Sequence, residues 1–305
     1  MLVKCKNCEK LVKTYHSYVK ILKHVFCNKK CRTEYRFLNK KNSKFFEKIN
    51  TEEKAYWLGF ICADGWMCSR EPSVGIGLSI RDKNHLMKFA KLFNAHTWEN
   101  SQKVQVQVYN PFLYEQLLNK GVVPKKSLID CLEVFKYIPR SLIHHFVRGW
   151  FDGDGSIYKM SGHESLFCFS ITGTKGNLNE LQNIIMDGIE SLRKTKIYND
   201  HSVFSLKWGG NNQIINIRRW LYNDATVFLE RKKEKFDKIE LKKRKGSSIY
   251  RGVSWSKKRN KWIASIQNNK KVYNLGGFDK EEEAAMEYNK ALKDYGHSLN
   301  KRNMI

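Results

Sequence analysis

Acidic residues are scarce in this chain of 305 residues. Asp and Glu number 30 against 56 Lys and Arg, which leaves a formal net charge of +26 at pH 7. Such an excess of positive charge attracts polyanions, and binding to one would release the counterions condensed on it. Because the basic residues are spread along the whole chain and interleaved with aromatics, we expect nucleic acid as the partner.

Long apolar runs and lipidation motifs are also absent, which argues against a membrane protein. The first residues lack the apolar stretch of a secretory signal, so we expect an intracellular, reducing compartment. In that compartment the eight cysteines should not form disulfides. At this length the chain can form two or three domains.

Four cysteines form two close pairs near the N-terminus, Cys5-x2-Cys8 and Cys27-x3-Cys31. Two such pairs, separated by a basic loop, have the spacing of a tetrahedral Zn²⁺ site. A segment this short cannot bury enough apolar surface to fold without a metal. We therefore predict a structural zinc module over residues 1–45.

Two histidines between the cysteine pairs, His16 and His24, are alternative zinc ligands, although the four cysteines form the simpler set. The run from Phe26 to Arg36 resembles the entry from knuckle to helix in a treble-clef zinc finger. The other four cysteines lie in apolar or strand-like contexts and are expected to pack in the interior.

Two segments carry nearly the same sequence, WLGFICADG at 57–65 and VRGWFDGDG at 147–155. Each reads as an apolar helix with small residues four positions apart on one face, along which another backbone can approach closely. These small residues are Gly59 and Ala63 in the first copy and Gly149 and Gly153 in the second. Each copy ends on an aspartate followed by a glycine, and we expect Gly65 and Gly155 to close the helices in the left-handed conformation.

Asp64 and Asp154 would emerge side by side if the two smooth faces packed on each other. A helix C-terminus carries partial negative charge, and a second carboxylate nearby adds repulsion. A divalent cation relieves both effects. The paired motif therefore predicts a metal site built across a pseudo-twofold axis.

This paired pattern resembles the single-chain form of the LAGLIDADG homing endonuclease family, over roughly Asn50 to Glu240. The first copy departs from the family at Cys62, where an acid is common, but the final acid is present in both copies. The resemblance implies an α+β core with two αββαββ repeats, whose antiparallel sheets form a saddle over double-stranded DNA. It also implies that the catalytic residues Asp64 and Asp154 hold Mg²⁺ for hydrolysis of both strands.

The core is expected at 46–241, with repeats at about 50–140 and 141–241. Alternating residues predict strands at 74–80, 104–108, 166–171 and 202–208, with helices at 82–93 and 177–189. The valines of 104–108 and Phe204, Leu206 and Trp208 should face the core. The side chains expected to face outward, toward DNA, are Gln105, Gln107, Ser205 and Lys207.

The family also places a basic residue from each repeat near the scissile phosphates. Its context, two residues before Ile-Pro, matches Lys136 in this chain. In the second repeat the run Leu-Glu-Arg-Lys-Lys resembles the family's closing motif and points to Lys232, with Lys233 and Lys207 as rivals. A lysine can organise the solvent around an attacking water or stabilise a pentacovalent phosphate.

Residues 242–248 form a basic linker, and the remainder, 249–305, follows a different pattern. It predicts three short strands at 250–255, 261–266 and 275–278 and a helix at 280–295. The combination resembles the apetala/ethylene-response-factor DNA-binding domain over Ser248 to Asn300. The resemblance implies DNA contacts through the sheet, with Trp255 standing where the family often has arginine and Gln267 where a basic residue is common. The positions that match DNA contacts of the family are Arg251, Trp255 and Trp262, and Gln267 is the fourth candidate contact.

The sequence as a whole predicts a site-specific endonuclease that makes metal-dependent double-strand breaks in DNA at a long recognition site. The resemblance associates it with a mobile intron or a similar element, and the internal repeat predicts a monomer with pseudo-symmetry. Two alternatives stay open, an RNA-splicing maturase that kept the fold and a DNA-binding regulator without cleavage. The two intact motif acids favour the nuclease.

Overall fold

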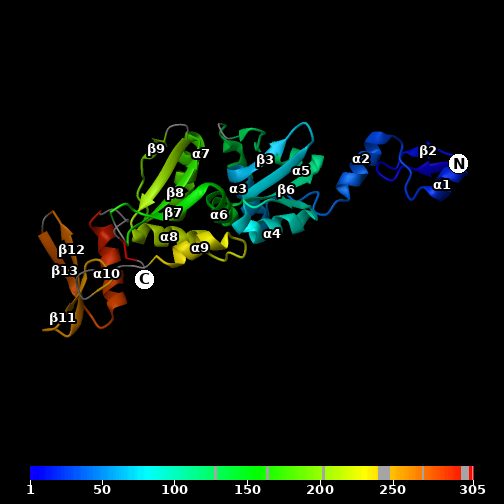
Figure 1. Ribbon diagram of the computed structural model, residues 1–305. Helices are drawn as coiled ribbons and strands as arrows, with labels where there is room; N and C mark the ends of the chain where they lie inside the picture. Colours follow the sequence, from blue (N-terminus) through cyan, green and yellow to red (C-terminus); the bar gives the residue numbers. More distant parts are fainter. Residues whose placement is uncertain are drawn as a thin grey trace. The chain divides into compact units, whose positions relative to one another are not determined.

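The computed structural model (Figure 1) describes residues 1–126, 129–162, 165–200, 203–239, 248–269, 271–296, 302–303 and 305. Two compact units, Met1–Gly153 and Asp154–Ile305, divide the chain. The mixed α+β architecture predicted from the sequence is confirmed. The predicted basic linker, up to residue 247, lies outside the described residues.

The first unit begins with a small module of two strands and two helices. Strand β1 (Leu2–Lys4) pairs antiparallel with β2 (Leu11–Lys13), and the helices α1 (His16–Ile21) and α2 (Lys29–Leu38) follow. Helix α2 begins where the Asn28 side chain accepts a hydrogen bond from the Cys31 backbone N–H at 2.8 Å. Such a cap satisfies one of the unpaired donors of the first turn.

The first repeat contains a four-stranded antiparallel sheet with strand order β3-β4-β6-β5. Its elements, in chain order, are α3 (Glu52–Asp64), β3 (Gly65–Cys68), β4 (Ser73–Ser79), α4 (Lys83–Phe93), β5 (Thr97–Glu99), β6 (Lys103–Tyr109) and α5 (Pro111–Leu118). Among the described residues, the 3₁₀ turn η1 (Ile80–Asp82) lies between β4 and α4, and the turns η3 (Leu132–Tyr137) and η4 (Arg140–Leu142) precede α6 (Ile143–Asp154).

The second repeat has the same order of elements and an equivalent strand order, β7-β8-β10-β9. Its elements after α6 are β7 (Gly155–Lys159), β8 (Phe167–Gly173), α7 (Lys175–Gly188), β9 (Ile197–Asp200), β10 (Val203–Gly209), α8 (Asn211–Tyr222) and α9 (Glu230–Asp237). The predicted duplication of an αββαββ unit is therefore confirmed.

The alternation predicted for β6 matches the observed burial, whereas in β10 Phe204, predicted to face the core, is only partly buried. In β6 the three valines are buried and Gln105 is exposed, while in β10 Leu206 and Trp208 are buried. Helix α4 packs on β4 and β6, and helix α7 packs on β8 and β10. Each sheet thus has one face covered by helices and one face turned away from the core.

The C-terminal part forms a three-stranded antiparallel sheet and a helix, as predicted. Strands β11 (Val253–Ser256), β12 (Lys261–Asn268) and β13 (Lys271–Phe278) precede α10 (Glu281–Asp294). Strand β11 begins later than predicted because Gly252, at φ +73°, turns the chain against the Tyr288 ring. Strand β13 begins earlier than predicted because Lys271 pairs with Asn268 at the end of β12.

Among the described residues, none of the helices combines the length and the apolar character that crossing a membrane requires.

Candidate functional site

Helices α3 and α6 approach each other through their glycines. A Cβ added at Gly59 would collide with the carbonyl oxygen of Phe146 and lie 2.9 Å from its carbonyl carbon. A Cβ at Gly149 would collide in the same way with the carbonyl of Tyr56. The close backbone approach predicted from the small residues is therefore confirmed, and the contact at Gly59 is equivalent to the contact at Gly149.

The approach continues to the C-terminal end of α3. A Cβ on Gly153 would lie 2.5 Å from the Ala63 Cβ and 3.2 Å from the Asp64 backbone nitrogen. Asp64 is the last residue of α3 and is exposed, whereas Asp154 is the last residue of α6 and is partly buried. Each motif aspartate therefore ends a helix, where the helix dipole disfavours a carboxylate without a cation.

The glycines after the aspartates do not behave as the sequence predicted. Gly65 has φ −84° and ψ 164°, and neither it nor Gly155 has a positive φ. Both glycines are the first residues of strands, so the chain passes straight from helix to extended backbone. Glycine is still required at position 65, because a Cβ there would lie 2.8 Å from the Ile61 Cα.

The carboxylates of Asp64 and Asp154 are of the ligand type that enzymes acting on phosphates usually use for Mg²⁺. Magnesium is typically held by one or two carboxylates together with substrate phosphate oxygens and water, without a full cage of protein ligands. Within the described ranges, the one group of three or more Cys, His, Asp or Glu that could hold a metal is the cysteine set. A magnesium site at Asp64 and Asp154 would therefore need DNA to complete it.

Lys136, predicted near the scissile phosphate, is 70% exposed in η3, with its Nζ 2.7 Å from the Glu133 carboxylate. That contact raises the pKa of Lys136. A different lysine, Lys126, donates from its Nζ to the carbonyl oxygen of Ala63 at 2.9 Å. Its ammonium group therefore lies beside the peptide that precedes Asp64.

The sequence reasoning missed Lys126, although a positional signal could have found it. Lys126 follows α5, the helix that closes the first repeat, after a short connection, and Lys232 follows α8, the equivalent helix of the second repeat. Comparing the two repeats beyond their last common helix narrows the choice to the lysines of these two segments, whereas the Ile-Pro context selects Lys136.

In the second unit, the lysine chosen from the sequence is buried. Lys232 is 4% exposed and shares a face of α9 with Phe236, four residues later. Helix α9 packs on β7, the strand that starts directly after Asp154. Lys233 instead forms an ion pair with Asp237 at 2.8 Å, and Lys207 lies over the Tyr198 ring, so neither rival is placed like Lys232.

Three of the four residues predicted on the outer faces of the sheets lie there. Gln105 is exposed, Gln107 donates to the Ser73 hydroxyl at 2.8 Å, and Lys207 is partly exposed. Ser205 shares the strand face of Lys207 but is only 2% exposed, so its prediction as an outward contact is wrong. The cause is its place on a central strand, flanked by Thr172 and Tyr198 on the neighbouring strands.

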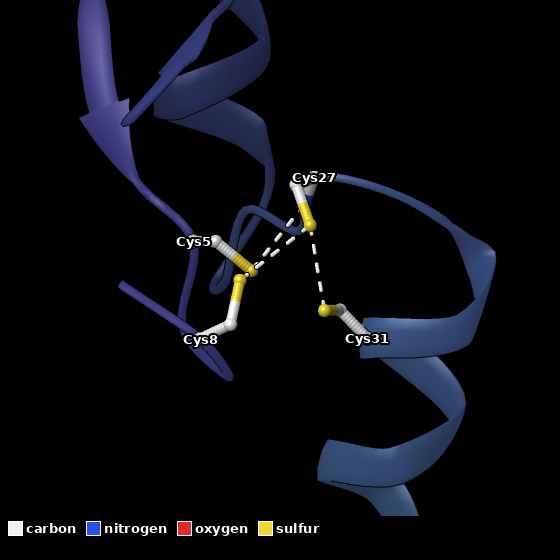
Figure 2. A group of neighbouring side chains, drawn as sticks. All are labelled: Cys5, Cys8, Cys27 and Cys31. Carbon is white, nitrogen blue, oxygen red and sulfur yellow. Dashed lines mark hydrogen bonds between the residues drawn. The ribbon is translucent and has the colours of Figure 1, made fainter. Parts of the chain in front are cut away.

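The four N-terminal cysteines converge as predicted (Figure 2). Cys5 and Cys8 come from the turn after β1, and Cys27 and Cys31 come from the entry to α2. All four sulfurs lie within 4.8 Å of one another, with 3.6 Å between Cys8 and Cys27 and 3.3 Å between Cys27 and Cys31. Four sulfurs at about 2.3 Å from a central Zn²⁺ would lie about 3.8 Å apart, so this donor set fits zinc.

The pKa values of these thiols differ because their hydrogen bonds differ. Burial would raise the pKa of Cys5, but backbone N–H groups of Cys8, Cys27 and Asn7 outweigh it and lower the pKa to about 6. The Cys31 thiol, followed by burial, raises the pKa of Cys27 to about 12. Zinc ligation deprotonates such thiols, so binding would release protons at neutral pH.

The two histidines between the cysteine pairs have other contacts. The His16 Nδ1 lies 3.4 Å from the Met1 sulfur, and the His24 Nε2 lies 3.5 Å from the Tyr35 hydroxyl. His24 also packs edge-on against the Phe26 and Tyr35 rings. The structure therefore favours the four-cysteine set.

The C-terminal sheet separates the residues that the sequence grouped as one DNA-contacting surface. Trp255 pairs with Trp262, on the face that carries Val253 and Ala264, and Trp262 packs against that core. Gln267 is exposed, three residues after Ala264 and thus on the opposite face. Both tryptophans lie on the helix side because period-two alternation fixes them there once Val253 is buried.

Arg251 precedes β11 and is anchored through its backbone. Its N–H donates to the Asn303 Oδ1 at 2.6 Å, and its carbonyl accepts from the Asn303 Nδ2 at 2.9 Å. Asn303 is bound in turn to Asn289 of α10. The segment that carries Arg251 is thus held in place by α10.

No protein-family model and no curated protein matches the sequence. Similar solved structures include the LAGLIDADG meganuclease I-AabMI bound to uncleaved DNA, at 12% identity and a TM-score of 0.43 over 62% of this chain and 88% of that one. They also include the LAGLIDADG homing endonuclease I-GzeII in complex with its DNA target, at 15% identity and a TM-score of 0.41 over 60% and 87% of the chains. Full-length DUF199/WhiA from Thermatoga maritima matches at 16% identity and a TM-score of 0.41, over 65% and 64%. At such low identities and TM-scores, this chain's own residues must carry any functional conclusion.

Proposed function

We propose that this protein is a site-specific endonuclease that cleaves both strands of double-stranded DNA with the help of Mg²⁺. The observation that carries the proposal is the packing of α3 against α6 through Gly59 and Gly149, in a chain where each helix ends on an aspartate. Two carboxylates, one from each repeat, suit a substrate with two scissile phosphates. The net charge of +26 suits a polyanionic substrate.

In this proposal Asp64 and Asp154 would hold the metal. Bound Mg²⁺ would supply the activation of water and the stabilisation of the leaving oxygen that in-line phosphodiester hydrolysis needs. Lys126, held beside the carbonyl before Asp64, would orient the solvent around one phosphate. Lys232 is the corresponding candidate in the second repeat, in place of Lys233 or Lys207.

The remaining surfaces are proposed to bind DNA without contributing chemistry. Gln105, Gln107 and Lys207 would contact the major groove, where a glutamine can pair with adenine and a lysine with guanine or phosphate. The zinc module of residues 1–45 and the tail of residues 249–305 would extend the site, the tail through Arg251 and the Gln267 face of its sheet. Such linked modules raise affinity through effective concentration.

The resemblance of the motif copies also implies association with a mobile intron or a similar element. A maturase or a DNA-binding regulator would need no metal-binding carboxylates, and both carboxylates are present. These alternatives are separated from the nuclease by cleavage itself.

The test is to incubate the full chain with a library of randomised plasmids and Mg²⁺ and to sequence the ends produced. A recurrent double-strand break at one long sequence is expected. The Asp154→Asn variant should bind the selected DNA as well as the wild type, or better, because one charge that repels phosphate is gone, but should not cut it. A wild type that leaves every plasmid intact, or a variant that cuts at the full rate, would refute the assignment.

A further inference from the structure

A buried hydrogen bond ties the start of α3 to the last turn of α6. The Tyr56 hydroxyl donates to the Asp152 Oδ2 at 2.8 Å and lies 2.8 Å from the Nε2 of His85 on α4. Tyr56 and His85 are fully buried, and Asp152 is 2% exposed. Because the hydroxyl has one proton and gives it to Asp152, the His85 Nε2 must donate to the hydroxyl oxygen.

Arg148, one turn before Asp152, extends this cluster to the first turn of α3. Its guanidinium donates to the Glu52 carboxylate at 2.6 Å and lies 2.7 Å from the His145 Nδ1. It also stacks over the Tyr56 ring, 5.4 Å from the centroid, and is fully buried. The carboxylate, the guanidinium and the imidazoles hold α6 at a fixed rotation against α3 and α4.

The first motif copy lacks the residues that would form an equivalent hydrogen bond and charged cluster. Aligning 57–65 with 147–155 places Phe146 opposite Tyr56, Cys62 opposite Asp152 and Leu58 opposite Arg148. A phenylalanine has no hydroxyl to donate and Leu58 carries no charge. The end of α3 is instead contacted by Lys126 at the Ala63 carbonyl. The two motif aspartates are therefore supported by different chemistry.

We propose that Tyr56, acting through Asp152, is a positioning residue for Asp154 but not for Asp64, so that the two DNA strands are cut under separate control. The inference rests on the proposed nuclease function. Asp152 lies two residues before Asp154 in the final turn of α6, where few intrahelical bonds remain to hold the backbone. Loss of the Tyr56–Asp152 hydrogen bond lets that turn shift, and a misplacement of about 1 Å can lower the rate about a hundredfold.

The experiment uses the full chain, Mg²⁺ and a target duplex with a different label on each strand, so that the two cleavage rates are measured separately. Tyr56→Phe should change the ratio of the two rates by about tenfold to a hundredfold and accumulate DNA nicked on one strand. Tyr114→Phe, the same change on α5 in the same unit, is the matched control and should leave the ratio unchanged. Asp152→Asn keeps an oxygen that can accept a hydrogen bond from Tyr56, so it should largely preserve the wild-type ratio of the two rates.

Tyr56→Phe removes one donor from the buried Asp152 carboxylate and is expected to destabilise the unit. The double variant Tyr56→Phe/Asp152→Cys therefore recreates the Phe and Cys pair that the chain itself uses at the other helix end. It removes both partners of the Tyr56–Asp152 bond, so no carboxylate is left facing the lost hydroxyl, and it should give the same nicked product. Lys126→Met, beside Asp64, should slow the opposite strand.

The outcomes separate this inference from the function on which it rests. A wild type that cuts no DNA overturns the nuclease assignment and this inference with it. A wild type that cuts, with a folded Tyr56→Phe or double variant that slows both strands equally or neither, overturns the inference alone. A general packing role for Tyr56 would lower both rates together, so the change in ratio is the decisive readout.

Discussion

Replacing Gly149 with alanine should destabilise the first unit strongly, although alanine is the better helix former. The new Cβ would collide with the Tyr56 carbonyl oxygen and lie 2.9 Å from both the Phe60 nitrogen and the Tyr56 carbonyl carbon. Ordinary contacts begin at 3.4 Å, so clearing the Phe60 nitrogen and the Tyr56 carbonyl carbon alone takes a shift of about 0.5 Å, and clearing the colliding oxygen takes more. A gap of that size already forfeits about a quarter of the dispersion energy along the contact.

The alanine regains about 1 kcal/mol of helix propensity. Overpacking costs about 1–3 kcal/mol and more when, as here, the obstacle is backbone that cannot rotate away. We expect a net loss of about 3 kcal/mol, which lowers the Tm of a unit of this size by about 6–12 °C. Hydrogen exchange should localise the loss to α3 and α6.

Gly173→Ala is the matched control for this change. Its Cβ would meet Leu178 at 3.7 Å, an ordinary contact, and alanine restricts the unfolded chain more than glycine does. The control should therefore match or exceed wild-type stability. Equal Tm values for Gly149→Ala and wild type would refute the close packing on which the site depends.

Three further outcomes follow from the site. Elemental analysis should find one Zn²⁺ per chain, and chelation or Cys27→Ser should increase hydrogen exchange in about the first forty residues while α3 and α6 stay protected. Lys126→Met should slow cleavage of the affected strand by about 10²–10³-fold. Lys136→Met, at an exposed ion pair, should cut like the wild type. If Lys136→Met were the slower variant, Lys136 and not Lys126 would be the lysine near the phosphate. Burial, followed by the Arg148 charge, lowers the pKa of His145 from 6.5 to about 4. The stability that this group contributes above pH 6.5 should therefore be lost as the pH falls toward 4. Urea titrations of His145→Asn should show a smaller loss of stability over the same pH range.

Patterns local in sequence were sufficient to predict most of the fold. The valines of β6 alternate with polar residues, and the two motif copies repeat the small residues that let helices touch. Both signals depend on spacing along one element, which the sequence contains in full. The cysteine pairs are a similar case, because ligand spacing restricts the possible geometry.

What the sequence could not predict depends on neighbours from other elements. Ser205 has the polarity of an outward residue, but Thr172 and Tyr198 on the adjacent strands bury it. Trp262 matches a DNA-contacting position of the similar family, but its pairing with Trp255 places it on the helix side of the sheet. Strand pairing decides both cases, and no single strand encodes its partners.

The cysteine that replaces an acid in the first motif has a physical explanation in the buried cluster. The equivalent residue of the second motif, Asp152, is 2% exposed and accepts a hydrogen bond from Tyr56, so its carboxylate is committed to the interior. The Asp152 carboxylate therefore contributes to the packing of the two helices. In the first copy the residue aligned with Tyr56 is Phe146, which has no hydroxyl, so a carboxylate buried at position 62 would lack this donor. Cys62 is buried there, and burial raises the pKa of its thiol, so the side chain stays neutral without such a donor.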